Sequence, residues 1–181
     1  MKVSATELPG LMTVANFRAA DERGLFVKNF NASAFREAGL DAVFAESFYS
    51  VSGRNVIRGM HFQRPPAATA KLITVLSGRV LDVVFDLRRS SPTFGRSFAI
   101  ELDGSGATLL FIPAGLAHGF CALEEGTAMF YMCTAAFAAD LDSGFRFDSF
   151  GFGWPCAAVA ATVSARDRKL PGLDELGVIF P

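Results

Sequence analysis

Short apolar or alternating runs, separated by Gly, Pro, Ser and Asp, recur along the chain. They predict strands over residues 57–63, 72–76, 80–85, 97–102, 108–112 and 129–134. Ser77-Gly78 separates two of these runs and is typical of a hairpin turn. Residues 103–106 predict a further turn. Evenly spaced short strands of this kind indicate an all-β sandwich or barrel.

Helical segments are scarce. Residues 33–39 predict a short helix that is capped by Ser33 and ended by Gly39. A second short helix is predicted near residues 173–176. No internal repeat or linker interrupts the chain, so we expect residues 1–181 to form a single domain.

The composition predicts an ordered protein with a large core. The chain has 181 residues, of which 51% are hydrophobic and 19% are charged. Its net charge of -1 argues against a protein that binds nucleic acid, because such proteins carry a basic excess. The 19 phenylalanines are spread along the chain, which predicts a barrel interior packed with aromatic rings.

Three further features bear on location. Cys121, Cys133 and Cys156 are odd in number and lack paired spacing, which indicates reduced thiols in a reducing compartment. No signal peptide is evident, and no stretch of 18 uninterrupted apolar residues predicts a membrane span. We therefore expect a cytoplasmic protein without membrane partners.

The chain has two histidines, and both lie in strand-like segments. In the 57–63 run, alternation places His61 and Gln63 on one face and Arg58 with its alternate neighbours on the other. His61 is therefore either a pocket residue or a hydrogen-bonded core histidine. His118 follows a Pro-x-Gly turn, which places it at the start of another strand and favours a pocket shared with His61.

A metal centre is not expected in this pocket. Divalent metals need three or four nitrogen or oxygen ligands, and the chain has no third histidine. The pocket must then supply its own base, acid and electrostatic stabiliser. We expect no cofactor.

Three other side chains are candidates for this chemistry. Lys71 opens the strand that follows the His61 segment, and Tyr131 is one of two tyrosines in a chain rich in Phe. Asp167 is an acid near the C-terminus. Tyr131 has a second interpretation as a core aromatic, and Asp167 as a solvated or helix-capping carboxylate.

Arginine is the side chain best suited to bind a diphosphate, by paired hydrogen bonds. Arg23, Arg58 and Arg146 are the candidates, although each is also compatible with a plain surface charge. The segment 86–90 is interpreted as a solvated turn without a functional role.

These segments together resemble the dTDP-4-dehydrorhamnose 3,5-epimerase family. The resemblance runs from Asp21 to Asp167, and its matching blocks are residues 21–24, 57–63, 71–72, 78–88, 91–95, 112–120, 144–148 and 154–155. The number of blocks and their order make the resemblance specific.

The resemblance implies a cupin-type double-stranded β-helix, or jelly-roll barrel, with a few short peripheral helices. It implies a metal-free homodimer that acts on a nucleotide-diphosphate sugar. The catalytic roles it implies are a base for His61, a partner carboxylate for Asp167, an enolate stabiliser for Lys71 and a general acid for Tyr131. The substrate-binding residues it implies are Arg23, Arg58, Gln63, His118, Phe137 and Arg146, with Phe137 where the family often has a tyrosine that stacks on the base.

The chain departs from the family on the nucleotide side of the pocket. A Gln-Asp-Asn-type segment is replaced by residues 45–50, a Glu by Lys28, and a Tyr-Tyr pair by Ala136 and Phe137. The predicted function is epimerisation of a nucleotide-linked 4-keto-6-deoxyhexose at C3 and C5 through an enolate. The alternatives are a 3- or 5-monoepimerase on a different nucleotide sugar and a non-catalytic sugar-nucleotide-binding cupin.

Overall fold

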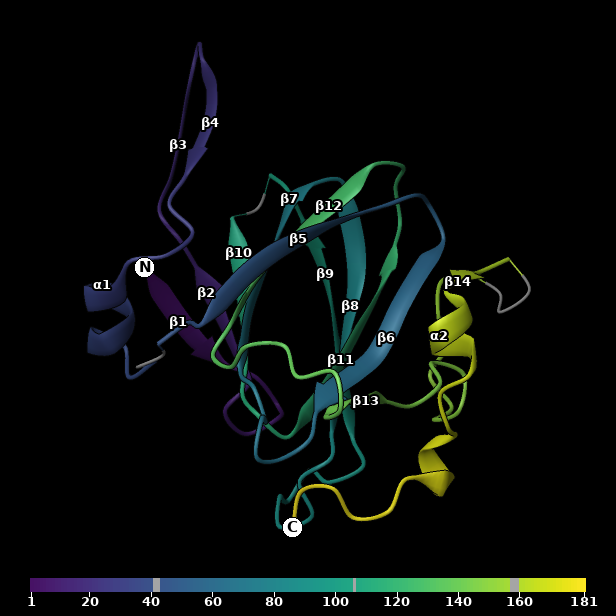
Figure 1. Ribbon diagram of the computed structural model, residues 1–181. Coiled ribbons are helices and arrows are strands. Elements are labelled where there is room, and N and C mark those ends of the chain that lie inside the picture. Colours follow the sequence, from purple (N-terminus) through teal and green to yellow (C-terminus); the bar gives the residue numbers. More distant parts are fainter. Residues whose placement is uncertain (41–42, 106, 157–159) are drawn as a thin grey trace.

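The computed structural model describes residues 1–40, 43–105, 107–156 and 160–181. Two sheets face each other and enclose the core, as Figure 1 shows. The first sheet contains, in spatial order, β1 (Lys2–Ala5), β2 (Met12–Ala15), β10 (Thr108–Ile112), β7 (Lys71–Ser77), β12 (Thr127–Cys133) and β5 (Glu46–Ser52). The second contains β13 (Asp142–Gly144), β6 (Val56–Gln63), β11 (Leu116–Ala122), β8 (Arg79–Asp86) and β9 (Ser97–Asp103), with β14 (Thr162–Val163) parallel to β6.

The remaining elements lie outside this barrel. Strands β3 (Arg18–Asp21) and β4 (Gly24–Val27) form a two-stranded arm that projects away from the sheets (Figure 1). The helices are α1 (Ala32–Glu37), α2 (Ala165–Arg168) and the 3₁₀ turn η1 (Leu173–Glu175). This arrangement confirms the predicted all-β jelly-roll barrel with short peripheral helices, and the six predicted strands are all present.

The prediction of a hairpin at Ser77-Gly78 is wrong. Strand β7 pairs with β10 and β12, whereas β8 pairs with β11 and β9, so the turn carries the chain from one sheet to the other. Gly78 has a φ of 76°, and a Cβ there would lie 2.4 Å from Thr127 Oγ1. A turn pattern between two apolar runs therefore identified the strands but not their partners.

The first helix is also capped differently from the prediction. The Asn31 side chain accepts a hydrogen bond from the Ala34 N–H and caps α1, while the Ser33 hydroxyl donates to Asn31. Gly39, at a φ of 75°, follows the helix as predicted. The helix buries Phe35 against the outer face of the first sheet.

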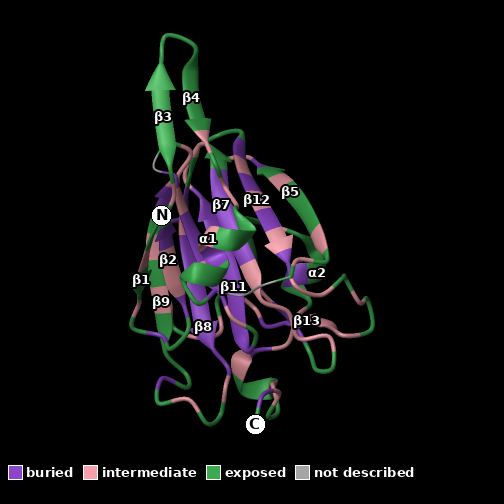
Figure 2. Ribbon diagram, turned by 90° about the vertical axis from the view of Figure 1, so that its left-hand side faces the viewer, coloured by how far each residue is buried: buried purple, intermediate pink, exposed green. Residues whose placement is uncertain are grey.

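The barrel interior is aliphatic, which corrects the expectation of an interior packed with phenylalanine. Buried side chains from both sheets meet there, including Ile73, Val84 and Leu110, and Figure 2 shows the buried positions along the central strands. Among the described residues, Phe120 and Phe98 are the phenylalanines of this cluster. Most other buried phenylalanines cover the outer faces of the sheets, where the C-terminal segment packs.

The segment 86–90 is not the solvated turn that we expected, because Asp86 is fully buried. Its carboxylate accepts hydrogen bonds from the Arg88 guanidinium and from the Ser91 and Thr93 hydroxyls, all at 2.7–2.9 Å. Burial alone would raise the pKa of Asp86, but these hydrogen bonds lower it to about 2. Arg88 also donates to the Pro9 carbonyl, so the network ties this loop to the N-terminal segment.

We predict that Asp86→Asn lowers the free energy of unfolding by about 2–3 kcal/mol at neutral pH, because buried donors lose a charged acceptor. The folded pKa lies below the ordinary value of 3.8. The contribution is therefore fully present above about pH 4 and is lost as the pH falls towards 2. Urea unfolding of both proteins between pH 7 and pH 3 measures the effect, and a difference that does not narrow with acid would contradict it.

Candidate active site

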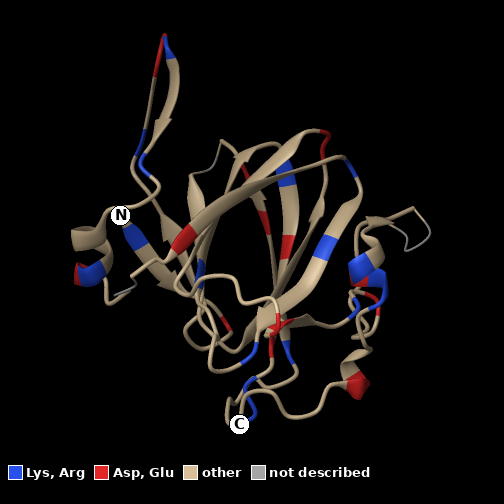
Figure 3. Ribbon diagram, viewed as in Figure 1, with Lys and Arg blue, Asp and Glu red and all other residues tan. Residues whose placement is uncertain are grey.

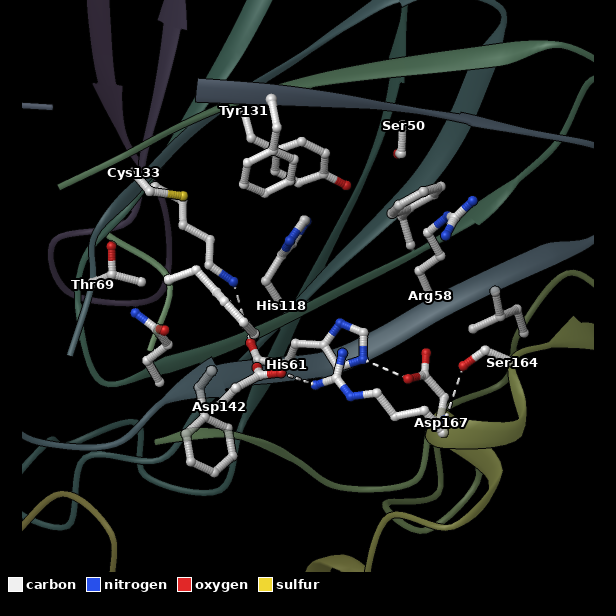
Figure 4. Close-up of a pocket in the computed structure, with 18 of the residues that line it drawn as sticks. Ser50, Arg58, His61, Thr69, His118, Tyr131, Cys133, Asp142, Ser164 and Asp167 are labelled. Carbon is white, nitrogen blue, oxygen red and sulfur yellow. Dashed lines mark hydrogen bonds and ion pairs between the residues drawn. The ribbon is translucent and has the colours of Figure 1, made fainter. Parts of the chain in front are cut away.

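A pocket of about 510 Å³ opens between the two sheets. Strands β6, β7, β11 and β12 form its walls, and β14 and α2 close one side. Figure 4 shows that His61, His118 and Tyr131 point into the same space from β6, β11 and β12.

An irregularity in β6 determines which side chains enter the pocket. His61 pairs with His118, but Arg58 rather than Gly59 pairs with Phe120, so β6 carries one extra residue there. Simple alternation placed Arg58 on the face opposite His61, and this prediction is wrong because the bulge turns Arg58 towards the pocket. His61 and Gln63 share the pocket face, as predicted.

His61 and Asp167 form a hydrogen-bonded pair at the pocket wall. His61 Nε2 lies 2.8 Å from Asp167 Oδ1, and the side chains are 24% and 4% exposed. The second oxygen, Oδ2, accepts the Gly59 N–H at 3.3 Å. The imidazole is therefore open to a ligand on one side and supported by a buried carboxylate on the other.

Local structure holds Asp167 in this position. Strand β14 runs parallel to β6, and the Ser164 hydroxyl then accepts the Asp167 N–H and caps α2. Burial would raise the pKa of Asp167, but the hydrogen bond and charge of His61 and the Gly59 N–H lower it below the ordinary value. Asp167 is thus an ionised, buried partner of the His61 ring, and it is neither solvated nor the helix cap.

Lys71 begins β7, and its Nζ lies 3.5 Å from the His61 carbonyl oxygen. Burial lowers the pKa of Lys71, and the charges of Cys133, Asp142 and Asp82 oppose this shift. The Lys71 side chain lines the same pocket as His61, but it comes from the other sheet.

Tyr131 lies across the pocket on β12 and is 7% exposed. Its ring stacks on Phe48 with centroids 4.7 Å apart and meets the His118 ring edge-on at 6.1 Å. Burial raises the pKa of Tyr131, and the negative charge of Asp82 adds to this shift. The phenol thus holds its proton well above neutral pH.

His118 has a partner that we did not predict from the sequence. Its Nε2 lies 2.8 Å from Oδ2 of Asp82, whose side chain is fully buried. A signal was present, because Asp82 lies between Val80 and Val84 on the inward face of β8 and interrupts the apolar run of residues 80–85. Other pocket residues to which we assigned no role include Glu46, Phe48, Ser50, Cys133, Asp142 and Arg166.

Besides His118, three predicted binding residues line the pocket, and their side chains differ in how far they are held by hydrogen bonds. Arg58 donates to the Ser52 hydroxyl and the Val51 carbonyl near the mouth, and the Phe137 ring is 62% exposed. Gln63 bonds the backbone of residues 67, 136 and 138, so its amide supports the adjoining loop.

Arg23 and Arg146, which were also predicted to bind substrate, do not line the pocket of their own chain. Arg23 lies at the turn of the β3–β4 arm, where it pairs with Asp21 and its side chain is 84% exposed. Arg146 lies beyond β13 and pairs with Asp148. Basic and acidic positions are interspersed over the ribbon in Figure 3.

Two further features are absent from the described part of the chain. Within it, no group of three or more His, Cys, Asp or Glu side chains is arranged to hold a metal ion. No helix in the same residues has the length and apolar character needed to cross a membrane.

The fold and this pocket define a cupin-type barrel whose pocket holds a hydrogen-bonded histidine–aspartate pair. The sequence model of the dTDP-4-dehydrorhamnose 3,5-epimerase family matches residues 5–175. The chain therefore belongs to this family, and it is an isomerase of the 3,5-epimerase type.

Individual relatives agree with this assignment. A dTDP-4-dehydrorhamnose 3,5-epimerase of Methanothermobacter thermautotrophicus is 37% identical over 94% of this chain and 93% of its own. A 3,5-epimerase of Legionella pneumophila, solved with dTDP-4-keto-L-rhamnose, has a TM-score of 0.93 at 29% identity, covering 99% and 97% of the two chains. A 3′-monoepimerase of Streptomyces bikiniensis, solved with dTDP-quinovose, has a TM-score of 0.87 at 30% identity, covering 93% and 86%.

Proposed function

We propose that this protein epimerises a dTDP-linked 4-keto-6-deoxyhexose at C3 and C5, with His61 as the base. The observation that carries the proposal is the His61–Asp167 pair, which shares one pocket with Lys71 and Tyr131. The Legionella relative, solved with a dTDP-linked 4-keto sugar, supports the choice of substrate.

The residue types match the chemistry of a 4-keto sugar. The ketone acidifies the hydrogens on C3 and C5, and removal of either leaves an enolate. A histidine works well as a base near neutral pH. In this mechanism Asp167 orients the His61 ring and stabilises the imidazolium that forms.

Lys71 and Tyr131 complete the reaction. The Lys71 ammonium stabilises the enolate oxygen, an interaction that is stronger in a pocket that excludes water. Tyr131 projects from the sheet opposite His61 and retains its proton, so it suits a general acid that protonates carbon from the other face. Protonation from that face inverts the configuration.

The remaining pocket residues suit a nucleotide diphosphate. Arg58 is the cation of β6 at the pocket, and arginine pairs well with phosphate oxygens. The exposed Phe137 ring offers a flat surface on which a base can stack. We assign His118 to the sugar, beside Tyr131.

A second candidate is a monoepimerase that acts at C3 or C5 alone. The likeness to the Streptomyces monoepimerase favours it, since the two folds superpose closely. Both candidates share the base and the enolate, and they differ in how many carbons exchange.

We predict that the wild-type protein in D₂O incorporates deuterium at both C3 and C5 of dTDP-4-keto-6-deoxyglucose, because His61 exchanges its proton with solvent. Mass spectrometry and NMR of the sugar measure the uptake. His61→Ala, the control, abolishes it. Exchange at one carbon selects the monoepimerase, and no exchange with dTDP-, CDP- or GDP-linked substrates would falsify both candidates.

We predict that Tyr131→Phe keeps proton exchange within about tenfold of wild type but slows inversion by about 10²–10⁴-fold, because only the general acid is lost. Comparison of deuterium uptake with product stereochemistry tests this. Tyr49→Phe is the matched control, since Tyr49 is exposed and lies outside the pocket. Equal loss of exchange and inversion would mean that Tyr131 only positions the sugar.

We also infer that the protein is a homodimer in which the arm of each copy reaches the pocket of the other. The arm exposes Leu25 and Phe26, and the edge strand β5 exposes Phe48 and Tyr49. A lone two-stranded hairpin is marginally stable, and an apolar sheet edge favours pairing with another chain. Such a dimer would bring Arg23 to a substrate diphosphate.

Mixing two inactive variants tests this arrangement. Arg23→Ala keeps His61, and His61→Ala keeps Arg23, so each mixed dimer contains one complete pocket if the arm acts on the partner. We predict that an equimolar mixture, allowed to exchange subunits, recovers about a quarter of wild-type activity by statistical pairing. If Arg23 acts within its own chain, the mixture stays inactive, and a monomer in sedimentation rules out the dimer.

We infer a single epimerase domain over residues 1–181 in a reducing, cytoplasmic setting. The family match over residues 5–175 supports the domain. Cys121, Cys133 and Cys156 are free and buried, and the sulfurs of Cys121 and Cys156 lie 3.5 Å apart without a bond, which supports the setting.

A further inference from the structure

A second histidine–aspartate pair lies deeper in the barrel than His61–Asp167. The Asp82 side chain on β8 is fully buried, and its partner His118 is 4% exposed, against 24% for His61. His118 and His61 are cross-strand partners, so both imidazoles stand on the same face of the sheet. The pocket is thus bordered by one partly exposed pair and one fully buried pair.

The buried pair connects the two sheets. Asp82 holds His118, and the His118 ring meets Tyr131 edge-on at 6.1 Å. Phe48 stacks against Tyr131, so the phenol ring touches two fixed neighbours. The orientation of the His118 ring therefore helps to set the position of Tyr131.

Asp82 occupies its position at an energetic cost. Its Oδ1 is buried, and among the described residues no hydrogen-bond donor reaches it. Val80 and Val84, two residues away on either side, pack into the aliphatic interior. An apolar side chain at position 82 would suit the same interior, so packing does not explain a carboxylate there.

We propose that Asp82 is a positioning residue for the acid side of the pocket: it orients His118 against Tyr131 and places a buried carboxylate directly behind this pocket residue. The proposal rests on the epimerase function proposed above. Asp82 is not among the residues that line the pocket, so it acts through its neighbours and not on substrate.

The charge of Asp82 acts on two groups that must carry protons. It adds to the effect of burial in raising the pKa of Tyr131, and it opposes the effect of burial in lowering the pKa of Lys71. Arg58, Cys133, Asp142 and Arg166 also act on these two groups, and His118 lies beside Tyr131 and His61 beside Lys71. Asp82 therefore favours the protonated form of both the phenol and the ammonium.

Removal of the Asp82 charge shifts the pH dependence of the activity in one direction. The pKa of Lys71 lies below its ordinary value and that of Tyr131 above it, so Lys71 loses its proton first as the pH rises. Deprotonation of Lys71 then sets the alkaline limb of activity. Removal of the Asp82 charge moves this limb to lower pH.

Asp82→Asn tests the proposal, with Asp86→Asn as the matched control. Asp86 is also fully buried on β8, but its partners Arg88, Ser91 and Thr93 lie away from the pocket. We expect kcat for inversion to fall about 10- to 100-fold in Asp82→Asn, with the alkaline limb about one pH unit lower. We expect the control to keep the wild-type limb, and an unmoved limb in Asp82→Asn would overturn the proposal.

A second measurement does not depend on activity. The chain has four lysines, Lys2, Lys28, Lys71 and Lys169, so ¹³Cε-lysine NMR can follow each titration, with Lys71→Met for assignment. We expect Lys71 to titrate at lower pH in Asp82→Asn than in wild type. Equal titration midpoints of Lys71 in the two proteins would overturn the proposal even if the enzyme is active. Absence of deuterium uptake by the substrate with the wild-type protein would overturn the epimerase function alone.

A variant that retains the charge covers the case in which Asp82→Asn does not fold. His118→Gln leaves the Asp82 carboxylate and removes the ring between it and Tyr131. We expect inversion to fall more than proton exchange in this variant, while the Lys71 midpoint stays at its wild-type value. Equal loss of inversion and exchange would contradict the role assigned to His118.

Discussion

Close backbone packing between Gly59 on β6 and Gly119 on β11 organises the pocket. A Cβ at Gly59 would lie 2.5 Å from Gly119 Cα, and a Cβ at Gly119 would lie 2.9 Å from the Arg58 carbonyl oxygen. Two glycines allow β6 to carry its extra residue against β11, with Gly59 at a φ of 134°. The bulge brings Arg58 to the same side as His61 and directs the Gly59 N–H towards Asp167.

Two buried carboxylates influence which side chains of the pocket carry a proton. The ionised Asp167 lies hydrogen-bonded to His61, and Asp82 favours protons on Lys71 and Tyr131. In the proposed mechanism, base and acids are thus separated by their electrostatic surroundings as well as by the two sheets. A pocket of this kind can move protons at neutral pH without a large change in its own structure.

Local patterns predicted the positions of the strands better than they predicted which strands pair. His61, Lys71, Tyr131 and Asp167 line one pocket, as the resemblance to the family implied. The pairing of β7 and β8 with other strands and the side of β6 on which Arg58 lies were mispredicted, because both depend on contacts between distant segments. Asp82 was overlooked although its place among inward-facing valines was visible in the sequence.

The base and its carboxylate come from separate parts of the molecule. His61 belongs to the barrel. Asp167 lies on the C-terminal tail, in which β14 runs beside β6 and is followed by the four-residue helix α2. The tail also packs buried aromatic side chains on the outer face of the second sheet, and β14 and α2 close one side of the pocket. A substitution at position 167 would leave the barrel strands and both histidines in place but give His61 a new partner. The partner of this imidazole can therefore change without a change in the strand that carries it.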